Sequence, residues 1–352
     1  MSKKILWLPL VFLFAAFLLM PSMAMAGAGA LDTFSGAVFF MAKGGADWAT
    51  AVKGVEVNAG DKIRTGSDGR ALIVFGDGTK IMLGNDSELE ISDYMVSAKK
   101  RSAVYTLATG KVRAIVTKFA GKSDIKVRTR TAVAGVRGTD FIVMNQGNAN
   151  VMFGNEGTVA ASAAGGKDSV PLKAGQMTEN TSGVTPIKPI AVEPGTPLAE
   201  ARAQLEAVTD VNAPVEWEAA GKLPAILARW NINYGHYLAD SKRFKDALNI
   251  FQIAIDLTEI SLIRAEAHLE RGTVLSRNLN DPKAALTEYL TVIEKYPVSE
   301  FVDNAVYSSG VIYMDMGDKE NARRLFTRYI GEYPKGARRG TVEILLKSLE
   351  NN

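Results

Sequence analysis

The stretch DIKVRTRTAVAGVRGTDFIV, residues 124–143, decides the fold of the first half of the chain. Its beginning alternates apolar and basic side chains, which is typical of a strand with one buried face. A run of small residues, 132–135, follows, and residues 141–143 form a second apolar segment. The pattern predicts a strand, a tight turn that Gly135 and Gly138 permit, and a second strand. The residues of the predicted turn are Val136, Arg137, Gly138, Thr139 and Asp140.

Short apolar runs separated by turn signals continue on both sides of this stretch. The signals at 59–61, 67–69 and 76–78 illustrate a recurrence of about ten residues, and no helical pattern interrupts them. Such spacing is typical of many short strands in a sandwich, a barrel or a solenoid. We therefore expect residues 31–180 to form an all-β domain, either solenoid-like or a twisted sandwich.

Composition places the chain among globular proteins with two ordinary domains. It has 352 residues, of which 47% are hydrophobic and 22% charged, with a formal net charge of +3. It contains no cysteine, which excludes disulfides, thiolate metal sites and cysteine nucleophiles.

The first 26 residues have the pattern of a secretory signal peptide. Lys3 and Lys4 precede an apolar run at 5–20, and Ala24-Met25-Ala26 offers a small-residue cleavage site. The alternative is an uncleaved membrane anchor, which the short apolar run and the cleavage site disfavour. We expect the mature protein to be periplasmic or otherwise exported, with no membrane span after cleavage.

Residues 181–197 predict a linker between two domains. Four prolines lie within the last twelve of these residues, and proline fixes φ and removes a hydrogen-bond donor. The segment is therefore expected to be extended and semi-rigid. Thr196 and Pro197 then form a helix start, and residues 198–352 are predicted to be helical.

The helical half repeats one pattern. Ala322, Leu325, Phe326 and Tyr329 share one helix face, and equivalent alanines recur at 285 and 247. Each of these helices follows another amphipathic helix. The period predicts an α-solenoid of about three repeats over 224–334. A capping helix is expected to follow at 340–349.

The repeated unit resembles the tetratricopeptide repeat. The residues that match this family's pattern, all expected to pack helix against helix, are Gly235, Ala247, Phe251, Ala285, Tyr289, Gly310, Tyr313, Ala322 and Phe326. The resemblance implies a groove that binds an extended or helical segment of a protein partner.

The opening stretch resembles the periplasmic domain of the FecR family. Residues 127–143 match its signature V-R-T-x-x-A-x-x-G-V-R-G-T-x-F-x-V, and 60–66 and 77–79 match further family patterns. The resemblance implies an all-β domain outside the cytoplasm, in a family of sensor regulators.

Basic residues concentrate between positions 99 and 137, where eleven Lys or Arg residues occur with one acid, Asp124. They form either one solvated sheet face or an interaction face, at Lys126, Arg128 and Arg130, for an anionic envelope polymer or lipid headgroup. Nucleic acid is not expected as a partner after export. Arg137 and Asp140 either pair or cap the turn, and the alternative for Arg137 is a ligand contact.

No combination of residues indicates catalysis. His236 and His268 fall in the helical half, where helix packing explains them better than a role as a base. The oxygen-rich turns at 76–79 and 84–87 lack the ligand series of a calcium loop. We expect no enzyme activity, cofactor or metal.

The sequence therefore predicts a non-enzymatic exported envelope protein. Its β domain would dock or sense, and its repeats would recruit a protein partner. The alternative is a structural or assembly scaffold of the cell envelope without a signalling role.

Overall fold

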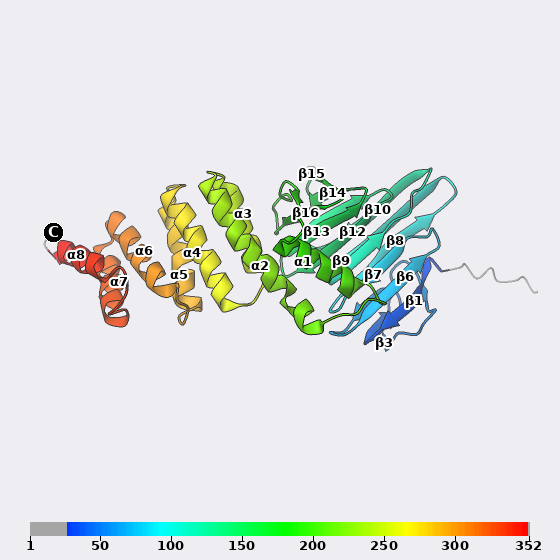
Figure 1. Cartoon of the computed structure of the whole chain (residues 1–352), viewed down its shortest axis with the longest axis horizontal. Coiled ribbons are helices and arrows are strands. Elements are labelled where there is room, and N and C mark those ends of the chain that lie inside the picture. Colours follow the sequence, from blue (N-terminus) through cyan, green and yellow to red (C-terminus); the bar gives the residue numbers. More distant parts are fainter. Residues whose placement is uncertain (1–26, 351–352) are drawn as a thin grey trace, which may run out of the picture.

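The computed structural model describes residues 27–350, so the predicted signal peptide, residues 1–26, lies outside the described residues. No helix in the described part is long and apolar enough to cross a membrane. Strands extend from Gly29 to Ala191, and helices from Pro197 to Glu350 (Figure 1). The predicted order, an all-β domain followed by an all-α repeat domain, is confirmed.

The strands are short except for β9, which has sixteen residues. Their bounds are β1 Gly29–Ser35, β2 Val38–Met41, β3 Ala49–Thr50, β4 Glu56–Val57, β5 Lys62–Thr65, β6 Arg70–Phe75, β7 Lys80–Leu83, β8 Glu88–Val96, β9 Lys100–Ile115, β10 Lys122–Arg128, β11 Ala132–Val136, β12 Asp140–Gln146, β13 Ala149–Glu156, β14 Thr158–Ala163, β15 Ser169–Lys173, β16 Gln176–Asn180 and β17 Ile190–Ala191.

Two sheets share β9. Sheet A has the order β4-β1-β6-β7-β9-β12-β13-β16-β17, and sheet B has the order β3-β2-β5-β8-β9-β10-β11-β14-β15. The first part of β9 pairs in sheet B and its last six residues pair in sheet A. Gly110, with φ +97°, lies at the crossing, where a Cβ would be 2.2 Å from the Ser87 Oγ atom. Only glycine fits this corner.

The stretch 124–143 contributes to three strands, β10, β11 and β12, instead of the two that its pattern predicts. The run of small residues that precedes the predicted turn forms β11, which pairs with β10 and β14. Gly135 lies within β11, and a Cβ there would meet only Ala160, at 3.8 Å or more. The expectation that Gly135 permits a tight turn was therefore wrong, because this residue lies in the middle of a strand that pairs on both sides.

Both faces of sheet A are buried. One face packs against sheet B in a core that includes Ile73, Tyr105 and Phe141. The other face, with Ile142 and Phe153, packs against the first three helices. A strand that is buried on both faces has a continuous run of apolar residues instead of an alternating pattern, and β12 and β13 both contain such a run.

The helices are α1 Pro197–Thr209, α2 Trp217–Asp240, α3 Phe244–Leu257, α4 Ser261–Arg277, α5 Pro282–Lys295, α6 Val302–Asp315, α7 Lys319–Glu332 and α8 Arg339–Glu350. Thr196 caps α1 by accepting a hydrogen bond from the Ala199 backbone. Helices α2 to α7 stack as three antiparallel pairs that lead away from the sandwich, and α8 follows at the far end (Figure 1).

The proline-rich segment 181–197 lies against the body of the protein. Its residues 190 and 191 form β17, which pairs with β16. Ile187, Ile190 and Val192 pack against the core formed with the helices. The apolar residues between the prolines explain this docking, because their burial favours a fixed segment over a free one.

Candidate functional site

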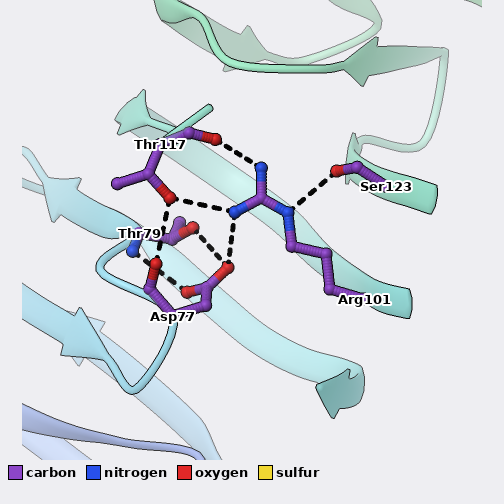
Figure 2. Close-up of polar contacts among 5 residues, drawn as sticks. All are labelled: Asp77, Thr79, Arg101, Thr117 and Ser123. Carbon is purple, nitrogen blue, oxygen red and sulfur yellow. Dashed lines mark hydrogen bonds and ion pairs between the residues drawn. The ribbon is translucent and has the colours of Figure 1, made fainter. Parts of the chain in front are cut away.

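Arg101, near the start of β9, forms a buried polar cluster (Figure 2). Its Nε donates to the Ser123 Oγ atom at 2.9 Å, and its Nη1 donates to Asp77 Oδ2 at 3.0 Å and to Thr117 Oγ1 at 2.9 Å. Its Nη2 donates to the Thr117 carbonyl. Asp77 also accepts hydrogen bonds from the backbone and hydroxyl of Thr79, at 3.0 and 2.9 Å.

This arrangement is suited to holding the fold together. The guanidinium and carboxylate groups neutralise each other, and the Phe119 ring lies 5.0 Å from the guanidinium carbon. Arg101 is only 1% exposed, so a ligand has no access to it. Removing one partner of such a pair costs about 3–5 kcal/mol, because the other charge is left buried and unpaired.

The predicted turn Val136–Asp140 forms a corner between β11 and β12. Gly138 has φ +70°, and a Cβ there would lie 2.7 Å from the Lys118 side chain. Arg137 is exposed. Asp140 accepts two hydrogen bonds from Arg113 of β9, at 2.9 and 2.6 Å. Asp140 therefore pairs with Arg113, and this hydrogen bonding raises the pKa of Arg113.

The structure divides the basic segment 99–137 into groups with different surroundings. Arg101 and Lys111 are buried, and Lys111 donates to the Asn85 carbonyl and side chain. Burial lowers the pKa of Lys111. Most of the other basic residues of this segment have exposed side chains.

The predicted interaction face is mainly solvent-facing. Lys126 pairs with Asp124 at 3.0 Å, and Arg130 donates to the Gly147 carbonyl at 2.5 Å. Arg128 is exposed. Arg137 borders a shallow depression of about 380 Å³ over β10, β11, β14 and β15, whose lining also includes Asp124 and Gly135.

Sequence reasoning missed the polar contacts between the sandwich and the helices. The Arg70 Nη1 atom donates to the carbonyls of Asp210 at 2.5 Å and Ala213 at 2.8 Å, just beyond the end of α1. Its guanidinium carbon also lies 5.5 Å from the Trp217 ring. This arginine satisfies carbonyls that a helix end leaves without a partner and fixes α1 and α2 to β6.

Glu179 of β16 is the second missed residue at this boundary. It is 1% exposed, and its Oε2 accepts a hydrogen bond from the Asn231 amide of α2 at 3.2 Å. Burial raises the pKa of Glu179 to about 8, and the hydrogen bond from Asn231 opposes that shift. The carboxyl group is therefore mostly protonated at neutral pH.

The predicted repeat-packing residues meet in pairs. A Cβ on Gly235 would lie 2.5 Å from the Phe251 ring, and one on Gly310 would lie 2.5 Å from the Phe326 ring. Gly272 makes the equivalent approach to Tyr289 in the middle pair, also at 2.5 Å. The residues at the three small positions, Ala247, Ala285 and Ala322, are fully buried, and Tyr313 is half-buried.

Both histidines lie beside carboxylates of the repeats. His268 contacts Glu288 at 2.6 Å, and Arg271 donates to the same carboxylate at 2.8 Å. His236 lies 3.7 Å from Glu270. Burial by itself would raise the pKa of Glu288. The hydrogen bond from His268 and the charge of Arg271 outweigh burial, so the pKa of Glu288 is lowered. Within residues 27–350, no group of three or more His, Asp or Glu side chains is placed to hold a metal ion.

An aromatic row on α2 adjoins a cleft. The rings of Trp230 and Tyr234 stack with centroids 4.9 Å apart, and those of Tyr234 and Tyr237 are 5.9 Å apart. Tyr237 is 61% exposed. Tyr234 and Arg243 line the cleft, of about 540 Å³, between residues 183–188 and the α2–α3 pair. Stacked aromatics beside an arginine are enriched at protein-binding surfaces.

Comparisons with known proteins agree with this architecture. Residues 61–160, which extend from β5 to β14, match the family model described as FecR protein. Residues 304–336, which include α6 and α7, match a tetratricopeptide repeat. No curated protein matches the sequence.

Two crystal structures, at 1.65 and 2.50 Å resolution, show a distant likeness. Both are of a protein from Parabacteroides distasonis ATCC 8503 that is provisionally described as an anti-sigma factor, with 16% identity and a TM-score of 0.33. The likeness covers 41% of this chain and 64% of that protein, so this chain spans under two thirds of the relative. A likeness of this TM-score carries no conclusion about function.

The two matched families are non-catalytic, and they indicate a signalling or protein-interaction role. The chain thus joins a FecR-type β domain to a C-terminal region with a tetratricopeptide repeat.

Proposed function

We propose that this is a non-enzymatic exported envelope protein that docks or senses through its β domain and recruits a protein partner through its repeats. Export rests on the signal-peptide pattern of residues 1–26. The docking half of the proposal uses Lys126, Arg128 and Arg130, with an anionic envelope polymer as the ligand. Arg128 and Arg130 are exposed, which suits contact with such a polymer.

The observation that carries the recruiting role is the aromatic row on α2. The ring of Tyr237 stacks on Tyr234, which in turn stacks on Trp230, although most of Tyr237 faces solvent. A rigid exposed aromatic side chain loses little conformational entropy when it binds. The adjoining cleft offers Arg243 and Asp246 as polar partners. This combination suits an extended segment of a protein in the same compartment.

Photo-crosslinking in intact cells tests this role. A photoreactive residue at position 237 is compared with one at Val298, which is 97% exposed and lies between α5 and α6. We expect position 237 to give a discrete adduct with one envelope protein, and Tyr234→Ala to lower its yield about tenfold. Equal adducts at both positions, or adducts with cytoplasmic proteins only, would contradict the proposal.

One observation favours the scaffold alternative. Sheet A and helices α1 to α3 share a single core, and Arg70 and Glu179 tie the two parts together. A shared core of this kind holds the two parts in a fixed relative position and disfavours independent movement of either part. Deleting the protein would then lower the amount of the crosslinked partner in the envelope without changing transcription. A transcriptional response would favour signalling.

A further inference from the structure

The β8–β9 hairpin has a tip that is both apolar and basic. Met95 and Val96 end β8 with 47% and 43% of their surface exposed. Lys99 and Lys100 follow in the turn and at the start of β9, and both are exposed. The Ser97 hydroxyl holds the turn by bonding with the Lys100 backbone at 2.9 and 3.1 Å.

A third lysine adjoins this tip from the neighbouring strand. Lys122 begins β10 and pairs in parallel register with Lys100. Its backbone N–H donates to the Lys99 carbonyl at 3.0 Å. Across residues 27–350, no carboxylate forms an ion pair with any of these three lysines. Arg101 and Arg113, by contrast, are paired with Asp77 and Asp140.

The described chain begins beside the same tip. Gly27, Tyr94, Met95 and Val96 line one cleft of about 640 Å³. The Gly76 backbone N–H donates to the Ala28 carbonyl at 3.0 Å, which places the first described residues against this end of the sandwich. The C-terminus lies at the opposite end of the molecule (Figure 1).

We propose that the β8–β9 hairpin, together with Lys122, docks on the surface of an anionic lipid bilayer. Met95 and Val96 enter the headgroup layer, and Lys99, Lys100 and Lys122 contact lipid phosphates. The repeats then extend away from the membrane.

The position of Gly27 supports a bilayer as the occupant. Residues 5–20 are apolar, and in the sequence six residues separate them from Gly27, where the described chain begins. Whether this segment is cleaved or retained, export through it brings Gly27 to the membrane surface. An apolar contact with a bilayer that is weak on its own becomes stable anchoring when basic residues add electrostatic attraction to anionic lipids. The tip supplies both beside Gly27, where the described chain begins.

The absence of cysteine from the chain allows a direct test with a single label. An environment-sensitive dye is placed on the exposed Ala98→Cys in the full chain, and, as a control, on Ile344→Cys of α8, where Ile344 is 70% exposed. Phosphatidylglycerol vesicles should shift the emission of the dye at position 98 to the blue and leave position 344 unchanged. Pure phosphatidylcholine vesicles or high salt should remove the shift.

Charge-matched variants separate a specific tip from net charge. Each lysine near an anionic surface contributes about fivefold, from ~1 kcal/mol, so K99Q/K100Q/K122Q should weaken vesicle binding through the tip about 100-fold. K283Q/K295Q/K335Q removes three exposed lysines from the repeats and should leave binding unchanged.

Three results would overturn the proposal: equal loss in both triple variants, no shift at position 98, or an equal shift at position 344. These vesicles contain no protein, so failure here leaves the recruiting role of α2 untouched.

Discussion

The outer faces of the two sheets have opposite surroundings. On sheet A, the apolar side chains of β12 and β13 lie under α1, α2 and α3. On sheet B, the side chains of β10 and β11 alternate, and their outward positions hold polar, charged or small residues and Val133 that are exposed or half-buried. The comparison shows that one face is used to attach the repeats, whereas the other remains available for contacts outside the chain.

The largest expected effect comes from a large-to-small change on the covered face. Phe153 of β13 is fully buried against the helices. Phe153→Ala should lower the free energy of unfolding by about 3–5 kcal/mol, because it removes buried apolar surface and leaves a cavity. Denaturant unfolding followed by circular dichroism measures this loss.

Val104 provides the matched position on the open face, since it points outward from β9 and is half-buried. Val104→Ala should cost about 1 kcal/mol or less. If the two alanine variants lost equal stability, the contrast between the two faces would be wrong.

A smaller effect, dependent on pH, is expected at the boundary between sheet A and α2. The pKa of Glu179 is about 8 in the folded chain, above its ordinary value of 4.5, because the carboxyl group is buried. The folded state therefore retains a proton that the unfolded state releases. Stability from this proton is fully present below pH 4.5 and is lost as pH rises through about 8.

Glu179→Gln keeps the size and the hydrogen bond to Asn231 but cannot ionise. Relative to the unchanged chain, this variant should become progressively more stable between pH 5 and pH 9, by a few kcal/mol in all. Unfolding curves of both proteins at pH 5, 7 and 9 give the difference between their free energies of unfolding. The contributions of other titrating groups cancel in this difference. A difference that does not vary with pH would show that Glu179 is not buried in its neutral form.

The sequence predicts those features that depend on local pattern. The Gly138 turn and the glycine–aromatic approach at Gly235 and Gly310 follow from family signatures and periodicity. The continuous apolar runs in β12 and β13 also carried the information that a second layer covers sheet A. That signal could have predicted the covering helices.

Contacts between distant segments could not be predicted in this way. Arg70 bonds to residues 140 and 143 positions later, and Glu179 to one 52 positions later. The partner of Asp140 is Arg113 because β12 pairs with β9, and that pairing depends on how the two sheets share one strand. Register between distant strands has no local signature.

The smallest effect on stability is expected from the open face. Lys126→Gln, Arg128→Gln and Arg130→Gln together should change the free energy of unfolding by no more than about 0.5 kcal/mol, because exposed charges and surface ion pairs contribute little. Thermal unfolding measures this change, and binding to an anionic cell-wall polymer is measured on the same sample. A large loss of stability would mean that Arg130, through its bond to the Gly147 carbonyl, is part of the fold. Unchanged stability with weaker polymer binding would instead assign these three residues to recognition, as the solvent-facing side of sheet B leads us to expect.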